Sequence, residues 1–290
     1  MTDRWPLSAF GDEIDPSLEA QVDALQASEV AAVELRSAWG TNVVDMDGEQ
    51  LARAAGVLRD GGIAVSAIGS PIGKAPIDGD FEVERARLRQ AIHAAEQLDT
   101  RLIRVFSFYV ESQYAQHRDE VLRRMAAMTR DAEAAGLVLV HENESYIYGD
   151  LPERCRDMLE SVGSPALRMA FDPANFVQCG ARPMADAWPL LSEYVTHVHI
   201  KDAIRVDRTG LDPYPAPVPG DRLMPSVRPA GQGDGEVPQL IAELDRRGYE
   251  GYLTLEPHLG QTLPDLNGRG RFEVAVAALR GLLEQVPGRA

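Results

Sequence analysis

The feature that most constrains the fold is an alternation, along the whole chain, of short apolar segments with segments of helical periodicity. A strand that pairs in parallel with the next needs a crossover connection, so this alternation predicts a parallel sheet with helices outside it. The apolar segments are 7–14, 31–35, 63–70, 101–108, 137–144, 167–172, 194–202 and 252–258. The helical segments are 17–27, 49–60, 81–98, 118–135, 152–161, 184–191, 238–247 and 272–285.

Eight strand-and-helix units in 290 residues predict an α/β fold, a single closed (β/α)₈ TIM barrel over residues 1–290. An open doubly wound sheet is the alternative. The glycine fingerprint G-x-G-x-x-G is missing between the first strand and its helix, which disfavours that alternative. The glycine-rich segment 231–235 follows no strand directly and indicates a turn.

Residues 203–237, between the seventh strand and the next helix, break this rhythm. They include six prolines and are too long for an ordinary connection. In a barrel they form a long loop on the catalytic face, and dense prolines favour an ordered excursion such as a lid or a subunit contact. A disordered linker is the alternative, and a homo-oligomer is left open.

Composition narrows the classes of partner. The 45 acidic against 29 basic residues give a formal net charge of −16, which disfavours nucleic acid and anionic membrane surfaces as partners. Only two cysteines are present, as expected in a reducing compartment. The sequence shows neither a signal-peptide core nor an apolar run of membrane-spanning length, so we expect a cytoplasmic protein.

Chemically active residues gather where the later strands end. Glu142, Asp172 and Glu256 end the fifth, sixth and eighth strands, and His197 and His199 lie in the seventh. The carboxyl ends of barrel strands converge on one face, where three carboxylates repel unless a cation neutralises them. Oxygen and imidazole ligands predict one divalent ion, most suitably Mn²⁺, with Mg²⁺, Co²⁺ or Zn²⁺ as alternatives. Strand alternation leaves the choice of histidine open, and His199 is favoured because it lies nearer the strand end.

Five motifs together resemble the xylose-isomerase-like barrel family, which includes sugar-phosphate isomerases, ketose 3-epimerases, inosose dehydratase and endonuclease IV. They are HENE at 141–144, FDPAN at 171–175, HVHIKD at 197–202, G-x-G-D-G at 231–235 and GYEGYLTLEPH at 248–258. The similarity runs over nearly the whole chain, and the motifs are specific only as a set. The resemblance implies that Glu142, Asp172, His199 and Glu256 are the metal ligands and that the two glutamates double as catalytic acid and base.

The expected activity is that of a metal-dependent isomerase or epimerase acting on a small carbohydrate, phosphorylated or free. A divalent ion that holds a carbonyl and a neighbouring hydroxyl stabilises an enediolate, and a carboxylate moves the proton. The main alternative is a lyase or dehydratase of the same fold acting on a keto-inositol or keto-glycoside. A sugar-binding protein without catalysis is a third reading. DNA repair is disfavoured by the negative charge and by the small number of histidines, six in all.

Further residues near the strand ends are predicted to contact substrate. For three of them we also weigh a plainer role, with Lys201 an exposed loop cation, His258 a solvated turn residue and Arg36 a partner of a nearby carboxylate. In the fifth strand, alternation points His141 and Asn143 away from Glu142, which favours a structural His141 and a supporting Asn143. The predicted substrate contacts are Glu34, Arg36, Arg104, His197, Lys201 and His258.

Overall fold

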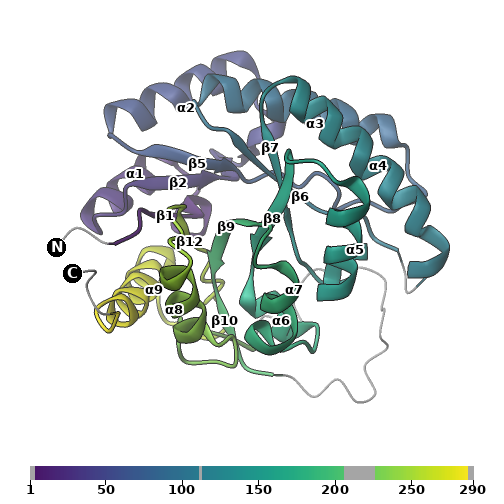
Figure 1. Cartoon of the computed structure of the whole chain (residues 1–290). Coiled ribbons are helices and arrows are strands. Elements are labelled where there is room, and N and C mark those ends of the chain that lie inside the picture. The colour runs from purple at the N-terminus through teal and green to yellow at the C-terminus, as the bar shows by residue number, and fades with distance from the viewer. Residues whose placement is uncertain (1–3, 111–112, 206–225, 287–290) are drawn as a thin grey trace.

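The computed structural model describes residues 4–110, 113–205 and 226–286, and its centre is a closed barrel of eight parallel strands (Figure 1). Neighbours around the barrel follow the order β1-β12-β9-β8-β7-β6-β5-β2, with β2 pairing back to β1. The predicted (β/α)₈ TIM barrel is therefore confirmed. The strands are β1 Leu7–Ala9, β2 Ala32–Leu35, β5 Ala64–Ile68, β6 Leu102–Val105, β7 Val138–Glu142, β8 Leu167–Phe171, β9 Val195–Ile200 and β12 Leu253–Leu255.

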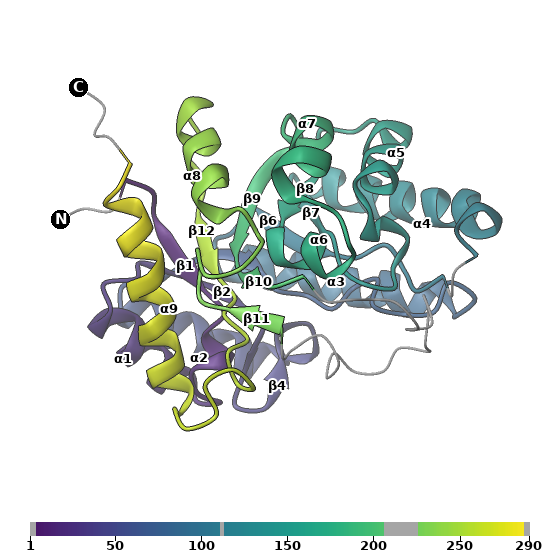
Figure 2. The same ribbon diagram turned by 90° about the horizontal axis from the view of Figure 1, so that it is seen from below.

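Helices surround the barrel and bury their apolar faces against it. Figure 2 shows α8 and α9 on one side of the molecule and α4 and α5 on the opposite side. No helix within the described ranges is both long and apolar enough to cross a membrane. The main helices are α1 Leu18–Ala27, α2 Gly48–Asp60, α3 Phe81–Gln97, α4 Tyr114–Ala134, α5 Pro152–Val162, α6 Pro173–Gln178, α7 Trp188–Leu191, α8 Val237–Arg246 and α9 Gly268–Leu283.

Two helices begin earlier than the sequence pattern predicts. The α4 helix begins at Tyr114 rather than Arg118, and no side chain caps its first turn, so no local signal marks the start. The α9 helix begins at Gly268 rather than Phe272, because the side chain of Asn267 accepts a hydrogen bond from the Gly270 N–H. Helix ends fixed by one capping side chain are easily misplaced from apolar periodicity alone.

The short helix α6 was not predicted, and it matters for the site. Asp172 is its N-cap, accepting a hydrogen bond from the Asn175 N–H at 2.9 Å, and Pro173 occupies its first turn. The cap engages Oδ1 of Asp172, which leaves Oδ2 directed elsewhere. Six residues are too few to show a helical period.

The long segment after β9 begins and ends at a short two-stranded sheet. Strand β10 Asp202–Ala203 pairs with β11 Val227–Arg228 in antiparallel fashion. The buried Asp202 carboxylate accepts hydrogen bonds from the backbone N–H groups of Gly231, Gly233 and Gly235 at 2.7–2.9 Å. The glycine-rich segment therefore forms turns, as predicted. Residues 206–225 of the predicted 203–237 loop lie outside the described residues, so its role stays a prediction.

Replacing Gly233 by alanine is expected to destabilise the protein by about 2–4 kcal/mol. A Cβ at this position would lie 2.7 Å from the carbonyl of Ala203 and would also meet the Asp202 carboxylate. Chemical denaturation measures the loss. The control is Gly56→Ala in α2, where the nearest atom is 3.8 Å away and a gain of up to about 1 kcal/mol is expected. Equal stability of the two variants would contradict this account of the turn.

Candidate metal centre

Four buried side chains meet at the carboxyl ends of neighbouring strands. Glu142 ends β7, Asp172 follows β8, His199 lies in β9 and Glu256 follows β12, and each is at most 3% exposed. Nδ1 of His199 lies 3.4 Å from Glu142 Oε1, 3.9 Å from Asp172 Oδ2 and 3.8 Å from Glu256 Oε2. The strand order therefore brings together the four residues predicted as ligands.

His199 is held in one orientation by a hydrogen bond to a buried carboxylate. Glu34, from β2, is fully buried, and its Oε2 lies 3.1 Å from His199 Nε2 and 2.7 Å from His197 Nε2. When the ring is neutral, donation from Nε2 to Glu34 leaves Nδ1 as its unprotonated nitrogen. Within the described residues, this buried Nδ1 has no hydrogen-bond partner. It is directed at the three carboxylates, as a metal-binding nitrogen would be.

The site carries more negative than positive charge. With neutral histidines, six carboxylates face three permanent cations. The excess favours added protons: burial opposes the charge on His199, but Glu34 and Glu142 outweigh it and raise its pKa well above the usual value. The carboxylates are Asp12, Glu13, Glu34, Glu142, Asp172 and Glu256, and the cations are Arg36, Arg104 and Lys201.

The three strand-end carboxylates differ in their readiness to ionise. Burial and Glu256 oppose the charge on Glu142, yet His199 and Arg104 lower its pKa to about 2. Burial likewise opposes ionisation of Glu256, but Lys201 and His258 hold its pKa well below the usual value. Burial raises the pKa of Asp172 to about 6, despite Lys201. Two of the three are therefore ionised at neutral pH, and the third titrates close to it.

These residues fit a divalent ion. Donor atoms 3.4–3.9 Å from His199 Nδ1 suit an ion whose bonds to nitrogen and oxygen are about 2.0–2.2 Å, after a small inward movement. The same four residues offer donor atoms that all lie within 4.8 Å of one another. A charge of +2 would offset most of the excess negative charge of the cluster. In the absence of metal, protons on histidine offset part of that charge.

The cationic residues predicted to contact substrate lie around the cluster. Arg104 is buried, with Nη1 3.2 Å from Glu142 Oε2. Arg36 pairs with Asp12 at 2.8 Å and with Glu256 at 3.2 Å, so its plainer role as the partner of a carboxylate is present. Lys201 is only 4% exposed, so the alternative of an exposed loop cation is wrong. The polar end of its strand suggested that Lys201 faces solvent. In the structure, its neighbours are carboxylates.

Three more residues complete the set of predicted substrate contacts. They are His258, Glu34 and His197. His258 has a positive φ of 44°, and its Nε2 lies 3.3 Å from Glu256 Oε1. Glu34 and His197 are both fully buried in the barrel interior, where His197 also lies 3.2 Å from the hydroxyl of Thr254. For Glu34 and His197, a direct substrate contact stays a prediction. Their position favours a role in supporting His199.

Asparagines connect the ligand strands. The Asn175 side-chain amide donates to Glu142 Oε1 at 3.0 Å and to the Asn143 carbonyl at 2.9 Å. The Asn143 side chain donates to the carbonyl of Asp172 and accepts its N–H, as the prediction of a supporting residue requires. Sequence reasoning missed Asn175, although FDPAN places it three residues after Asp172. His141 is buried against Ser107 and lies away from the cluster.

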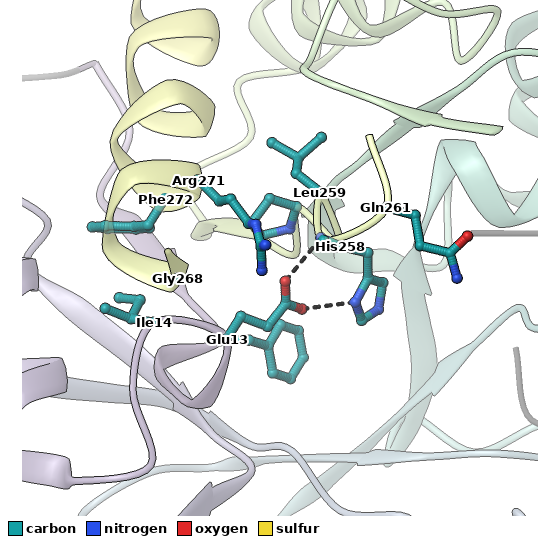
Figure 3. A pocket seen from close by; sticks show the side chains of 11 residues that line it. Glu13, Ile14, His258, Leu259, Gln261, Gly268, Arg271 and Phe272 are labelled. Atoms are coloured by element: carbon teal, nitrogen blue, oxygen red, sulfur yellow. Dashed lines mark hydrogen bonds and ion pairs between the residues drawn. The ribbon is translucent and has the colours of Figure 1, made fainter. Parts of the chain in front are cut away.

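A pocket of about 290 Å³ adjoins the cluster (Figure 3). In this view Glu13 points at His258, with Oε1 3.0 Å from Nδ1, and its other oxygen accepts the His258 N–H. Arg271 extends from α9 into the same pocket. His258 lines this pocket and also contacts Glu256, so it connects the pocket to the candidate metal centre. Sequence reasoning did not single out Glu13 or Arg271.

Replacing Glu34 by glutamine is expected to weaken binding of a divalent ion by about 10- to 100-fold. The neutral amide no longer accepts strongly from both histidines, and His199 loses its fixed tautomer. Titration of Mn²⁺ against a chelator measures the change. Glu144→Gln is the control, since Glu144 pairs with Lys74 at 3.0 Å outside the cluster. Unchanged affinity in the Glu34 variant would contradict a role in orienting His199.

Metal binding is expected to release about one proton at pH 7. The raised pKa of His199 means that a proton occupies the metal-binding nitrogen below that pKa, so affinity increases as pH rises toward it. Below about pH 6, protonation of Asp172 adds a second proton to be displaced. Calorimetry in buffers of different ionisation enthalpy counts the protons. Affinity independent of pH between 5 and 8 would contradict the assignment of His199 as a ligand.

Comparison with known proteins identifies the family. The model of the "Xylose isomerase-like TIM barrel" family matches residues 22–281, most of the chain. The chain belongs to this family. This confirms the resemblance seen in the motifs. Within the curated relatives, a 2-epi-5-epi-valiolone 7-phosphate 2-epimerase from Actinoplanes sp. (strain ATCC 31044 / CBS 674.73 / SE50/110) is 39% identical over 71 residues. That match spans only 24% of this chain and 24% of the relative.

Several solved structures share the fold of this chain at low sequence identity. The IOLI protein, solved with a bound zinc atom, superposes with a TM-score of 0.78 at 12% identity, covering 98% of this chain and 100% of that one. A probable 3-DHS dehydratase from Bacillus anthracis gives 0.74 at 18% identity, covering 94% and 98%. At such identities the likeness shows the xylose isomerase-like barrel, and chemistry has to be argued from the site.

Proposed function

We propose that the protein is a divalent-metal-dependent isomerase or epimerase of a small carbohydrate, with Glu142, Asp172, His199 and Glu256 as metal ligands. The observation that carries this proposal is the buried Nδ1 of His199, which makes no hydrogen bond to any described residue and faces three strand-end carboxylates at 3.4–3.9 Å. Membership of the xylose isomerase-like family and the partial similarity to an epimerase support it. Mn²⁺ is the expected ion on the grounds of its preference for oxygen and imidazole ligands.

The metal's contribution is electrostatic. When bound, the ion polarises a carbonyl group and acidifies the neighbouring C–H. The ligands would hold it near the open end of the barrel, because each one lies at or next to the carboxyl end of its strand. The buried Asn143 and Asn175 keep the ligand strands in register through their hydrogen bonds. The site is thereby arranged before substrate arrives.

Glu142 and Glu256 are suited to move the proton. In the barrel order, β8 and β9 separate β7 from β12, so the two glutamates approach the substrate space from different directions. Both have lowered pKa values and are ionised at neutral pH, so either can accept a proton from carbon. Return of the proton to the neighbouring carbon gives isomerisation, and return to the opposite face gives epimerisation.

Cationic side chains near the carboxylates are proposed to hold the substrate's oxygen atoms. Arg104 and Arg36 flank the carboxylates, and His258 connects them to the adjoining pocket. The pocket volume of about 290 Å³ is just below the range typical of small-ligand sites, about 300–1,000 Å³. A monosaccharide or cyclitol, free or phosphorylated, is the class of substrate that we propose.

A lyase is the second candidate, favoured by one feature. Lys201 Nζ lies 2.8 Å from Glu256 Oε2, and His258 lies 3.3 Å from its other oxygen, so two proton donors adjoin the proposed base. After proton abstraction, such a donor could protonate a leaving hydroxyl, and water would be lost instead of a proton being returned.

Incubation of metal-loaded protein with keto-sugars, keto-inositols and their phosphates in D₂O tests the proposal. An isomerase or epimerase is expected to introduce deuterium at carbon without other change in mass. Loss of the mass of water would establish the lyase. Tight sugar binding without exchange or elimination, with or without metal, would overturn both and leave a binding protein.

A further inference from the structure

Lysine is rare in this chain, and both lysines lie at the catalytic end of the barrel. All but two of the 29 basic residues are arginine, and the exceptions are Lys74 and Lys201. Lys74 is partly exposed and pairs with Glu144 in the loop after β7. Lys201 follows β9 and is 4% exposed. A compact ammonium, in place of the planar guanidinium used almost everywhere else, points to a specific geometric demand at position 201.

The contacts of Lys201 show that demand. Its Nζ lies 2.8 Å from Asp172 Oδ2 and 2.8 Å from Glu256 Oε2. These are the same two oxygens that face His199 Nδ1, at 3.9 Å and 3.8 Å. The third strand-end carboxylate, Glu142, lies beyond ion-pair distance from the Lys201 ammonium in the described structure. The ammonium therefore lies at one edge of the cluster, against two of its four proposed ligands.

We infer that Lys201 is a positioning residue of the metal centre: its ammonium holds Asp172 and Glu256 together before metal arrives, and its charge lowers the affinity for the divalent ion. This inference rests on the proposed function. Two buried carboxylates that share one small volume repel each other, and a buried cation between them offsets that repulsion. The same positive charge repels a divalent ion that binds to the same oxygens.

The ligand geometry does not depend on Lys201 alone. The Asn143 side chain hydrogen-bonds to both the N–H and the carbonyl of Asp172. Oδ1 of Asp172 accepts the Asn175 N–H. Oε1 of Glu256 lies 3.2 Å from Arg36 Nη1, and His258 lies close to the same oxygen. Loss of the lysine charge should therefore leave the ligands near their positions while removing the repulsion. On balance, metal affinity should increase.

Replacement of Lys201 by methionine, which has similar length and no charge, tests the inference. Competition titration with a chelator is expected to show Mn²⁺ binding about tenfold or more tighter than in the wild type. The metal-free variant should also melt at a lower temperature, with the difference reduced by saturating Mn²⁺. Lys74→Met, which removes the other lysine, should change neither property. Equal or weaker Mn²⁺ affinity in the Lys201 variant would overturn the inference, whereas a wild type that binds no divalent ion would overturn the proposed metal centre itself.

A measurement on the wild-type protein covers the case in which the Lys201 variant does not fold. With ¹⁵N-labelled lysine, the two side-chain ammonium groups give separate NMR signals, and Lys74 serves as the internal reference. Diamagnetic Zn²⁺ is expected to shift the Lys201 signal, with saturation at one equivalent, and to leave the Lys74 signal in place. An unchanged Lys201 signal in protein whose bound zinc is measured independently would overturn the inference.

Discussion

Replacing Glu256 by glutamine is expected to abolish exchange of the substrate's carbon-bound proton with solvent while leaving the barrel folded. Glutamine keeps the shape of the side chain but cannot accept a proton from carbon, and loss of a general base costs about 10²- to 10⁴-fold in rate. The same result is expected for Glu142→Gln. Exchange is measured as deuterium uptake from D₂O, and folding as the melting temperature.

The control for this experiment separates proton transfer from metal loss, because both glutamates are also proposed ligands. Metal content is measured for each variant, and rates are compared at saturating Mn²⁺. Glu144→Gln is a close control in sequence, since Glu144 lies two residues from Glu142 but pairs with Lys74. Normal exchange in both the Glu142 and Glu256 variants would rule out their assignment as acid and base.

The second large effect is expected from Asp172→Asn. Asparagine can still cap α6 through its side-chain oxygen, but it removes the charge of a proposed ligand, so metal affinity should fall about 100-fold or more. Wild-type protein at an Mn²⁺ concentration of about 100 times its Kd should gain about 2.7 kcal/mol of stability. The variant should gain almost none at that concentration.

Thermal denaturation with Mn²⁺ and with a chelator measures this difference. The stability of the two metal-free proteins is compared first, so that a change in the α6 cap is not taken for a change in metal binding. An equal Mn²⁺-dependent rise in melting temperature for wild type and variant would show that the ion binds elsewhere.

The barrel and the meeting of four strand-end side chains could be predicted because both depend on local signals. Eight apolar runs mark the strands, and parallel strands must place their carboxyl ends on one face. Glu142, Asp172 and Glu256 lie at those ends in the sequence itself. His199 could be preferred over His197 because it lies nearer the strand end, and in the structure its Nδ1 faces the carboxylates, one layer above His197.

Apart from the supporting role predicted for Asn143, the supporting contacts could not be predicted because they join segments that are distant in sequence. Glu34 reaches His199 across the barrel over 165 positions, which depends on the stagger of β2 against β9. Lys201 follows a strand end, where solvent is expected, but it is buried and pairs with Asp172 and Glu256, which come from other strands. The α6 helix that carries Asn175 is too short to show a period.

If four strand-end residues hold one divalent ion, anomalous diffraction from crystals soaked in Mn²⁺ detects it directly. We expect a single strong manganese peak bounded by Glu142, Asp172, His199 and Glu256, with His199 bound through Nδ1. A manganese peak at another place in the protein, or none at this cluster in crystals soaked at saturating Mn²⁺, would contradict the proposed metal centre.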